Sequence, residues 1–243
     1  ILENADCSLE LLTDKWKKKT GQTLSASAMS RTIARAGLTY KKTFRAIERD
    51  TERNKEKRKK FLLDLSLVPE RNRTYLDEAG SNLAMAPNFA WAPKNQRAYD
   101  KKPARRGGNL SMIGALKNTG MRALYPYDGA IDSEKFIDFI EKSLFKQLET
   151  DDVLIMDNCK IHHSRTVKDY LKKHNIQVLY LPPYSPELNP IEEAWSVVKN
   201  KLRREKTRTV AAYAAVMEKA KRCITPEKSI GFFRHTEMFH NLG

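Results

Sequence analysis

Three acidic residues stand at points of the sequence where carboxylates can do chemistry. Asp77 and Asp157 each follow a short apolar run typical of a buried strand, and Glu192 lies in the first turn of a helix expected to begin at Pro190. A charged side chain beside a buried run costs free energy unless it is paired or binds a metal ion. Carboxylates suit Mg²⁺ or Mn²⁺, and two such ions about 3.5–4 Å apart can activate a water or a 3′-hydroxyl during phosphodiester cleavage. The three acids are therefore candidate metal ligands and catalytic groups, although each one alone would equally fit a residue that caps a turn.

The elements that must bring these acids together alternate between strands and helices. Apolar, β-branched and aromatic runs predict strands, and amphipathic spacing next to capping residues predicts helices. The predicted strands are residues 74–76, 89–92, 110–116, 122–127, 153–156 and 178–181, and the predicted helices are residues 134–148, 164–174 and 190–203. This order favours an α/β fold with a mixed sheet. Two aspartates that end adjacent strands of such a sheet can converge with a glutamate from a helix.

Upstream of these elements, the sequence has the pattern of two short helices. Ser8 is the expected N-cap of a helix at residues 9–19, Ser25 is the expected N-cap of a helix at residues 25–36, and a glycine follows each helix. Two helices joined by a short turn fit a helix-turn-helix, although a plain helical hairpin has the same pattern. In a helix-turn-helix the second helix would recognise DNA, and its candidate contact residues are Ser27, Ser30, Arg31 and Arg35.

The composition is strongly basic, with 45 Lys and Arg against 30 Asp and Glu and a formal net charge of +15. Such a surplus indicates a polyanionic partner. Nucleic acid is the usual one, although an anionic membrane surface, a ribosome-type assembly or general solubility would also explain the charge. Residues 1–72 carry a net +7. Within them, residues 47–67 are an expected helix of mixed charge, which fits either a linker that tracks DNA or a solvated helix face.

Two further basic clusters are candidates for DNA contact. One follows the second helix, and the other is a loop between two predicted strands that would contact phosphates or clamp a second subunit, while a plain solvated loop fits as well. The residues of these clusters are Lys41, Lys42, Lys94, Arg97, Lys101, Lys102, Arg105 and Arg106.

Membrane insertion and disulfide cross-linking have no support in the sequence. No run approaches the roughly 18 apolar residues that a membrane span needs. The three cysteines lie far apart, and they form neither a metal-type pair nor a disulfide framework, which indicates a reducing compartment. The sequence begins with Ile1 rather than Met, so we expect residues to be missing before it.

The candidate acids lie in longer motifs. Asp157 opens DNCKIHHS, Asp77 lies in YLDEAG, and the downstream segment LPPYSPELNPIEEAW contains Glu192. Here the chain resembles the DDE transposases of the mariner superfamily, especially bacterial insertion-sequence members. That family has its first Asp at the end of the first strand, its second in an Asp-Asn-x-x-x-His pattern, and its Glu in a proline-rich stretch that residues 182–192 match throughout. The 34 residues between Asp157 and Glu192 are also a spacing of this family, and the resemblance covers about residues 8–230.

The resemblance implies a ribonuclease-H-like catalytic domain at residues 73–243, a basic helical linker at residues 47–72 and a helix-turn-helix segment at residues 1–46, shortened at its start. It also implies cut-and-paste movement of a DNA element: cleavage at inverted-repeat ends and strand transfer into TA target DNA, with two Mg²⁺ ions that Mn²⁺ can replace. Double-stranded DNA, a homodimer on that DNA and a bacterial cytoplasmic location are further expectations. The alternatives are a DNA-binding regulator that has lost catalysis and another nuclease of the same fold.

The resemblance also selects between Glu192 and Glu193, which are neighbours in the sequence. Glu192 takes the family position, and Glu193 is the fallback because adjacent helical residues point about 100° apart. We expect Asn158 to orient Asp157, and His162 to hydrogen-bond substrate phosphate or a catalytic carboxylate. A zinc site at His162 lacks companion ligands at suitable spacing. We expect Glu78 to be secondary, since it points opposite Asp77 in a strand, and Trp91 and Trp195 to pack in the core or at an edge.

Overall fold

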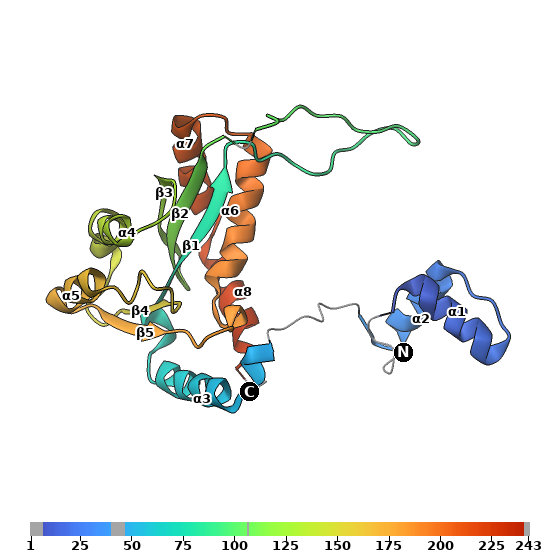
Figure 1. Ribbon diagram of the computed structural model, residues 1–243, viewed down its shortest axis with the longest axis horizontal. Coiled ribbons are helices and arrows are strands. Elements are labelled where there is room, and N and C mark those ends of the chain that lie inside the picture. Colours follow the sequence, from blue (N-terminus) through green and yellow to red (C-terminus); the bar gives the residue numbers. More distant parts are fainter. Residues whose placement is uncertain (1–6, 40–46, 106, 241–243) are drawn as a thin grey trace. The chain divides into compact units, whose positions relative to one another are not determined.

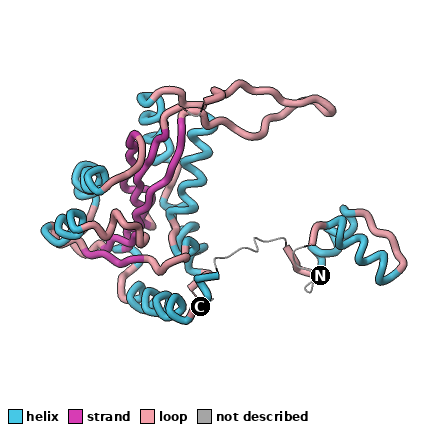
Figure 2. Tube along the Cα trace, viewed as in Figure 1, coloured by secondary structure: helices cyan, strands magenta, loops and turns pink. Residues whose placement is uncertain are grey.

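A computed structural model describes residues 7–39, 47–105 and 107–240 of the chain (Figures 1 and 2). The chain divides into two compact units, with the boundary between Ala46 and Ile47. Lys41, Lys42 and Arg106, which the sequence suggests as DNA contacts, lie outside the described residues.

The first unit contains two capped helices, α1 (Leu9–Thr20) and α2 (Ala26–Arg35). Ser8 and Ser25 cap them as predicted, because their hydroxyls accept hydrogen bonds from Leu11 N and Ala28 N at 3.3 and 3.2 Å. Gly21 ends α1 with φ of 75°, a conformation that glycine adopts without strain. Met29 is the one residue of these two helices that is buried. With so little buried apolar surface, these two helices have a very small hydrophobic core.

The second unit is built on a five-stranded mixed sheet in the order β3-β2-β1-β4-β5. β1 pairs with β2, and β2 with β3, in antiparallel fashion, whereas β4 runs parallel to both β1 and β5. The mixed α/β sheet that the sequence predicts is therefore confirmed. The bounds of the strands are β1 Arg73–Asn82, β2 Asn109–Lys117, β3 Gly120–Asp128, β4 Val153–Met156 and β5 Gln177–Tyr180.

Helices cover both faces of this sheet because successive side chains of a strand point to opposite sides. Tyr75 and Ile155 lie in one apolar core and Leu76 and Leu154 in the other. The first core is closed by α3 (Glu52–Ser66), α6 (Ile191–Glu205), α7 (Val210–Arg222) and α8 (Pro226–Glu237). The second is closed by α4 (Ser133–Phe139), the π-helical turn Ile140–Leu144 and α5 (Arg165–Lys173). Figure 1 shows α6 on one side of the sheet and α4 and α5 on the other.

The boundaries of several helices differ from the predictions. The helix predicted at residues 47–67 consists of a 3-10 turn, Ile47–Asp50, followed by α3. The helix predicted at residues 134–148 begins at Ser133 with Asp132 as its N-cap, and it changes to the π-helical turn at Ile140. Short 3-10 turns also occur at Glu70–Asn72, Phe145–Gln147 and Pro186–Leu188. The amphipathic helices α7 and α8 have no counterpart in the predicted elements, yet they close the first core.

The strand predicted at residues 89–92 is wrong. The described residues between β1 and β2 form a long irregular loop, residues 83–108 (Figure 2). Pro87 and Pro93 flank the predicted strand, and proline cannot donate a ladder hydrogen bond. Trp91 is fully exposed instead of packed, with a relative accessibility of 103%.

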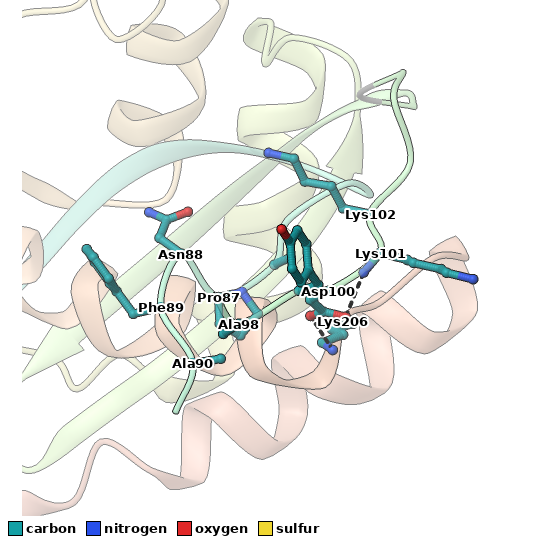
Figure 3. Close-up of a pocket in the computed structure, with 11 residues that line it drawn as sticks. Pro87, Asn88, Phe89, Ala90, Ala98, Asp100, Lys101, Lys102 and Lys206 are labelled. Carbon is teal, nitrogen blue, oxygen red and sulfur yellow. Dashed lines mark hydrogen bonds and ion pairs between the residues drawn. The ribbon is translucent and has the colours of Figure 1, made fainter. Parts of the chain in front are cut away.

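Two residues that follow α6 attach this loop to the rest of the second unit. Arg208 Nη1, in the segment after α6, donates hydrogen bonds to the carbonyls of Leu83 and Met85 at 2.9 and 3.0 Å. Lys206 pairs with Asp100 at 2.5 Å. Figure 3 shows these last two side chains in a cavity of about 570 Å³ that the loop encloses. In the part of the chain that the structure describes, no helix is long and apolar enough to cross a membrane.

Candidate active site

The pairing of β1 with β4 sets the relation between the first two candidate acids. These strands are parallel, and Tyr75 is the partner of Ile155. Asp77 and Asp157 each lie two residues beyond this last β1–β4 pair. Asp157 directly follows β4 as predicted, but Asp77 does not end its strand, since β1 continues to Asn82. The prediction was wrong there because β1 stays paired with β2, where Asp77 lies opposite Gly114.

Asp77 is held by a tryptophan from helix α6. Its carboxylate is 9% exposed, and Oδ2 accepts a hydrogen bond of 2.8 Å from Trp195 Nε1. Trp195 packs in the core as predicted, but the sequence did not reveal this hydrogen bond. The indole also fills the space above Gly114, where an added Cβ would lie 2.7 Å from Trp195 Cη2. A glycine inside β2 thus leaves room for the ring that holds Asp77.

The surroundings of Asp77 make its negative charge costly. Burial raises the pKa of its carboxyl to about 7, the Trp195 hydrogen bond opposes this rise, and the negative charges of Glu192 and Glu78 add to it. A carboxylate with a raised pKa next to other carboxylates is a favourable place for a cation, because a cation stabilises the ionised form.

On the other face of β1, a buried histidine connects Asp157 with Glu78. His162 is 0% exposed, and its Nδ1 and Nε2 lie 3.0 Å from Asp157 Oδ1 and 3.0 Å from Glu78 Oε1. Burial opposes protonation of this ring, but hydrogen bonds to the two carboxylates raise its pKa to about 10. Both ring nitrogens therefore donate at neutral pH. His162 contacts a candidate catalytic carboxylate, as expected, and Glu78 is its second partner, a role that sequence reasoning missed.

Residues of the loop after β4 form hydrogen bonds with the Asp157 carboxylate and hold it in place. The His162 hydrogen bond lowers the pKa of Asp157 despite partial burial, and the Cys159 amide, which donates to Oδ1 at 2.8 Å, lowers it further. The expectation that Asn158 orients the Asp157 carboxylate is not met. Asn158 instead donates to the Leu181 carbonyl and accepts from His163 Nε2, which ties this loop to the start of the proline-rich segment.

The third acid is positioned by the start of α6. Glu192 and Trp195 are three residues apart on this helix and so share a face. Partial burial raises the pKa of Glu192, Lys199 lowers it, and the negative charge of Asp157 raises it again. Glu193 instead pairs with His235 of α8 at 2.9 Å. Glu192 is therefore the acid of α6 that lies within electrostatic range of both aspartates.

A buried arginine from α3 fixes the proline-rich segment that precedes α6. Arg58 is 6% exposed, and its Nη1 donates to Ser185 Oγ at 3.0 Å and to Glu187 Oε1 at 2.6 Å. Arg49 also contacts Glu187, at 2.9 Å. Breaking a buried charge pair of this kind costs about 3–5 kcal/mol, so the helix start that carries Glu192 is firmly held.

The three acids suit a divalent cation by their chemistry. All three offer carboxylate oxygens, which Mg²⁺ and Mn²⁺ prefer. Within residues 7–39, 47–105 and 107–240, no three His, Cys, Asp or Glu side chains are gathered closely enough to hold a metal ion. The site is thus a set of neighbouring carboxylates that the sheet register and α6 hold near one another.

The predicted DNA contacts that the structure describes are all exposed. Four lie on α2 in the first unit, and five lie in the loop at residues 83–108 of the second unit. They are Ser27, Ser30, Arg31 and Arg35, followed by Lys94, Arg97, Lys101, Lys102 and Arg105.

A mixed sheet of this order, with carboxylates at adjacent strands and on a covering helix, defines a ribonuclease-H-like nuclease fold. The chain belongs to the DDE superfamily endonuclease family, whose sequence pattern matches residues 72–213. It is 27% identical over 201 residues to the insertion element IS630 39 kDa protein of Shigella sonnei, covering 81% of this chain and 58% of that protein. It is also 27% identical over 142 residues to the Tcb2 transposase of Caenorhabditis briggsae, covering 54% of this chain and 52% of the relative. The chain spans about half the length of the curated relatives it matches.

Solved structures of the Mos1 mariner transposase share the fold. A Mos1 paired-end complex with the left transposon end superimposes with a TM-score of 0.67 at 17% identity, over 96% of this chain and 75% of that one. A Mos1 paired-end complex with Mn gives a TM-score of 0.66 at 17% identity, over 96% and 77%. At 17% identity, this likeness shows a shared fold alone.

Proposed function

We propose that the protein is a transposase that cleaves DNA at transposon inverted-repeat ends and joins the freed 3′-hydroxyl to TA target DNA. Asp77, Asp157 and Glu192 are its catalytic residues. The observation that carries this proposal is the β1–β4 register, whose last pair lies two residues before both Asp77 and Asp157, in a chain of the DDE superfamily endonuclease family. The curated transposase relatives support the substrate.

The three carboxylates would hold two Mg²⁺ ions, which Mn²⁺ can replace, and Mos1 complexes with Mn and with Mg support divalent metal. The ions would activate the attacking water or 3′-hydroxyl and stabilise the leaving oxygen. The residues of the chain supply the positioning. Trp195 fixes one oxygen of Asp77, and protonated His162 fixes one oxygen of Asp157. A free lone pair on each carboxylate then remains for a metal ion.

The other parts of the chain fit DNA binding. We propose that residues 1–46 are a helix-turn-helix segment that recognises the inverted repeats through α2, and that residues 47–72 join it to the catalytic part. The basic loop at residues 83–108 would contact DNA phosphates or a second subunit of a homodimer. Exposed Trp91 and Phe89 favour a protein contact, because large exposed apolar side chains often mark interfaces. A bacterial cytoplasmic location remains part of the proposal.

A plasmid-nicking assay in Mg²⁺ or Mn²⁺ tests the catalytic assignment. Asp77→Ala, Asp157→Ala and Glu192→Ala should each lower the cleavage rate by at least about 100-fold, because each removes ligands of the ions that stabilise the transition state. DNA binding without metal should remain. Asp151→Ala is the matched control, since Asp151 is exposed before β4 and should leave cleavage unchanged. Cleavage by Asp157→Ala at the wild-type rate would instead support a regulator without catalysis.

A further inference from the structure

A groove of about 260 Å³ runs between α3 on one side and the end of β5 with the segment that follows it on the other. Lys57 and Lys60 form one wall, Tyr180 and Pro183 are on the other, and Asn158 lies at its end. We propose that this groove binds one unpaired strand of DNA next to the scissile phosphate. The proposal rests on the proposed function, because that function supplies the DNA.

The position of the groove connects it with the candidate active site. Asn158 directly follows Asp157 in the chain, and its side chain is bonded to the Leu181 carbonyl, which also belongs to the groove. A strand lying in the groove would therefore continue onto the Asp157 carboxylate. The groove is thus an extension of the catalytic centre and not a separate surface.

The charge of the groove favours a phosphate backbone. Lys57 and Lys60 are exposed and three residues apart on α3, so their side chains share a face. Neither lysine forms an ion pair with another residue in the part of the chain that the structure describes. Asp64 also borders the groove and reduces the net positive charge to that of one lysine. Two lysines without protein partners suit phosphates, whereas an acidic peptide would also need backbone hydrogen-bonding groups along the wall.

The opposite wall suits the sugar and base of the same strand. Tyr180 and Pro183 present apolar surface, and the Tyr180 ring is already supported by His163 with ring centroids 4.3 Å apart. Nucleic-acid bases pack on such rings with little sequence preference. The volume of about 260 Å³ is too small to admit duplex DNA, so part of one strand is the nucleic-acid ligand that it suits. A lysine wall facing an aromatic and proline wall therefore fits an unpaired strand better than duplex DNA.

The groove exists before any ligand binds. Arg58 lies next to Lys57 on α3, but it points inward and bonds to Ser185 and Glu187 of the proline-rich segment. This buried contact keeps α3 at a fixed distance from the opposite wall. Preformed walls lower the entropy cost of binding, since no element must be ordered first.

The first test measures binding of a short single-stranded oligonucleotide to the whole chain without divalent ions. We expect the affinity to fall severalfold in Lys57→Gln and in Lys60→Gln. The slope of log affinity against log salt should become shallower by about 0.7 for each lysine, as for each lost phosphate contact on single strands. Lys59→Gln is the matched control, because Lys59 is exposed on the same helix and does not line the groove. Equal losses in all three variants, or equal losses on blunt duplex DNA, would overturn the proposal.

The second test identifies which strand occupies the groove. If it is the strand that flanks the uncut transposon end, the lysine variants should slow cleavage of uncut ends. If it is the target strand, they should slow strand transfer from pre-cut ends while leaving cleavage unchanged. Either result supports the groove, and unchanged rates in both reactions would contradict it. Because the binding test contains no metal, it separates failure of the groove from failure of the catalytic assignment, which Asp157→Ala tests.

Discussion

At the scale of single residues, the candidate site depends on two hydrogen-bond donors, Trp195 and His162. Each donor fixes one of the two aspartates. Trp195 donates to Asp77 from helix α6, and His162 donates to Asp157 from the loop after β4. Hydrogen bonds to an ionised group are worth about 1.5–3 kcal/mol, so each donor also fixes the direction of the remaining lone pairs. Partners of metal ligands commonly change metal affinity or activity by about 10–100-fold when they are lost.

Trp195→Phe should therefore shift the pH dependence of cleavage. The indole hydrogen bond lowers the pKa of Asp77, so its loss raises that pKa from its value of about 7. A metal ion must displace the Asp77 proton, and more of the variant carries that proton at neutral pH. We expect the alkaline-rising limb of the cleavage profile to move to higher pH, and more Mg²⁺ to be needed for half-maximal nicking at pH 7 than in the wild type.

Tyr125→Phe is the control for this variant, because Tyr125 is an exposed aromatic residue of β3 that the proposed function does not use. A variant that merely loosened the core would lower the rate equally at every pH. An unshifted pH profile in Trp195→Phe would therefore mean that the indole does not control the ionisation of Asp77.

The positions of Asp157 after β4 and of Glu192 at the start of α6 agree with the sequence prediction, whereas most contacts of the candidate acids were not predicted. Both acids stand in long motifs and next to clear element boundaries, which a single sequence contains. The roles of Trp195 and Glu78 depend on the register between strands far apart in the chain, which periodicity does not give. Two signals were present nonetheless, since Trp195 is three residues from Glu192 and Gly114 interrupts an otherwise apolar strand.

At the scale of elements, β2 and α6 approach each other closely at one glycine. Gly114 lies opposite Asp77 in the β1–β2 ladder, and the Trp195 ring covers it. Glycine is unfavourable inside a strand unless a neighbouring group needs the space. This contact brings helix α6, with Glu192 at its start, down onto the strand that carries Asp77.

Gly114→Ala should destabilise the second unit and displace the indole. Its Cβ would lie 2.7 Å from Trp195 Cη2, and overpacking of this kind costs about 1–3 kcal/mol. For a unit of this size, that corresponds to a fall in the melting temperature of about 2–4 °C per kcal/mol. Gly80→Ala is the control, since no atom lies within 4 Å of a Cβ added at Gly80 in β1. Equal melting temperatures for the two variants would show that the Trp195 ring moves aside without loss of stability.

Element types were predictable where one periodicity dominated. The runs that became β2, β3 and β4 are apolar and bounded by turns, and the helix predicted at residues 164–174 corresponds to α5, with Ser164 as its N-cap. The error at residues 89–92 arose because aromatic residues suggested a strand that has no partner strand to pair with. The length of β1 was underestimated because pairing with β2 extends it through charged and small residues, whose own strand preference is weak.

At the scale of the whole molecule, the two units divide the charge and the apolar core unequally. Residues 1–46 contain nine basic and four acidic residues, a net +5, which leaves +10 for residues 47–243. Both large apolar cores consist of residues in the second unit. The second unit therefore has what it needs to fold and to bind DNA without sequence preference.

A protein of residues 47–243 should fold on its own and retain metal-dependent nicking of plasmid DNA. It should lose preference for inverted-repeat ends, because the helices proposed to recognise them are in the first unit. Circular dichroism would establish folding, and competition between end-containing and random duplexes would measure preference. Undiminished preference would place end recognition in the second unit.

The helices α6, α7 and α8, which close the core beneath Asp77, come last along the described chain. During synthesis, Asp77 and Asp157 leave the ribosome well before Glu192 and the helices that bury Trp195. A polypeptide interrupted before α6 lacks the third carboxylate and exposes Tyr75 and Met112, which makes it a substrate for chaperones and proteases. In the proposed transposase, the order of the elements would therefore delay assembly of the three carboxylates until α6 has been synthesised.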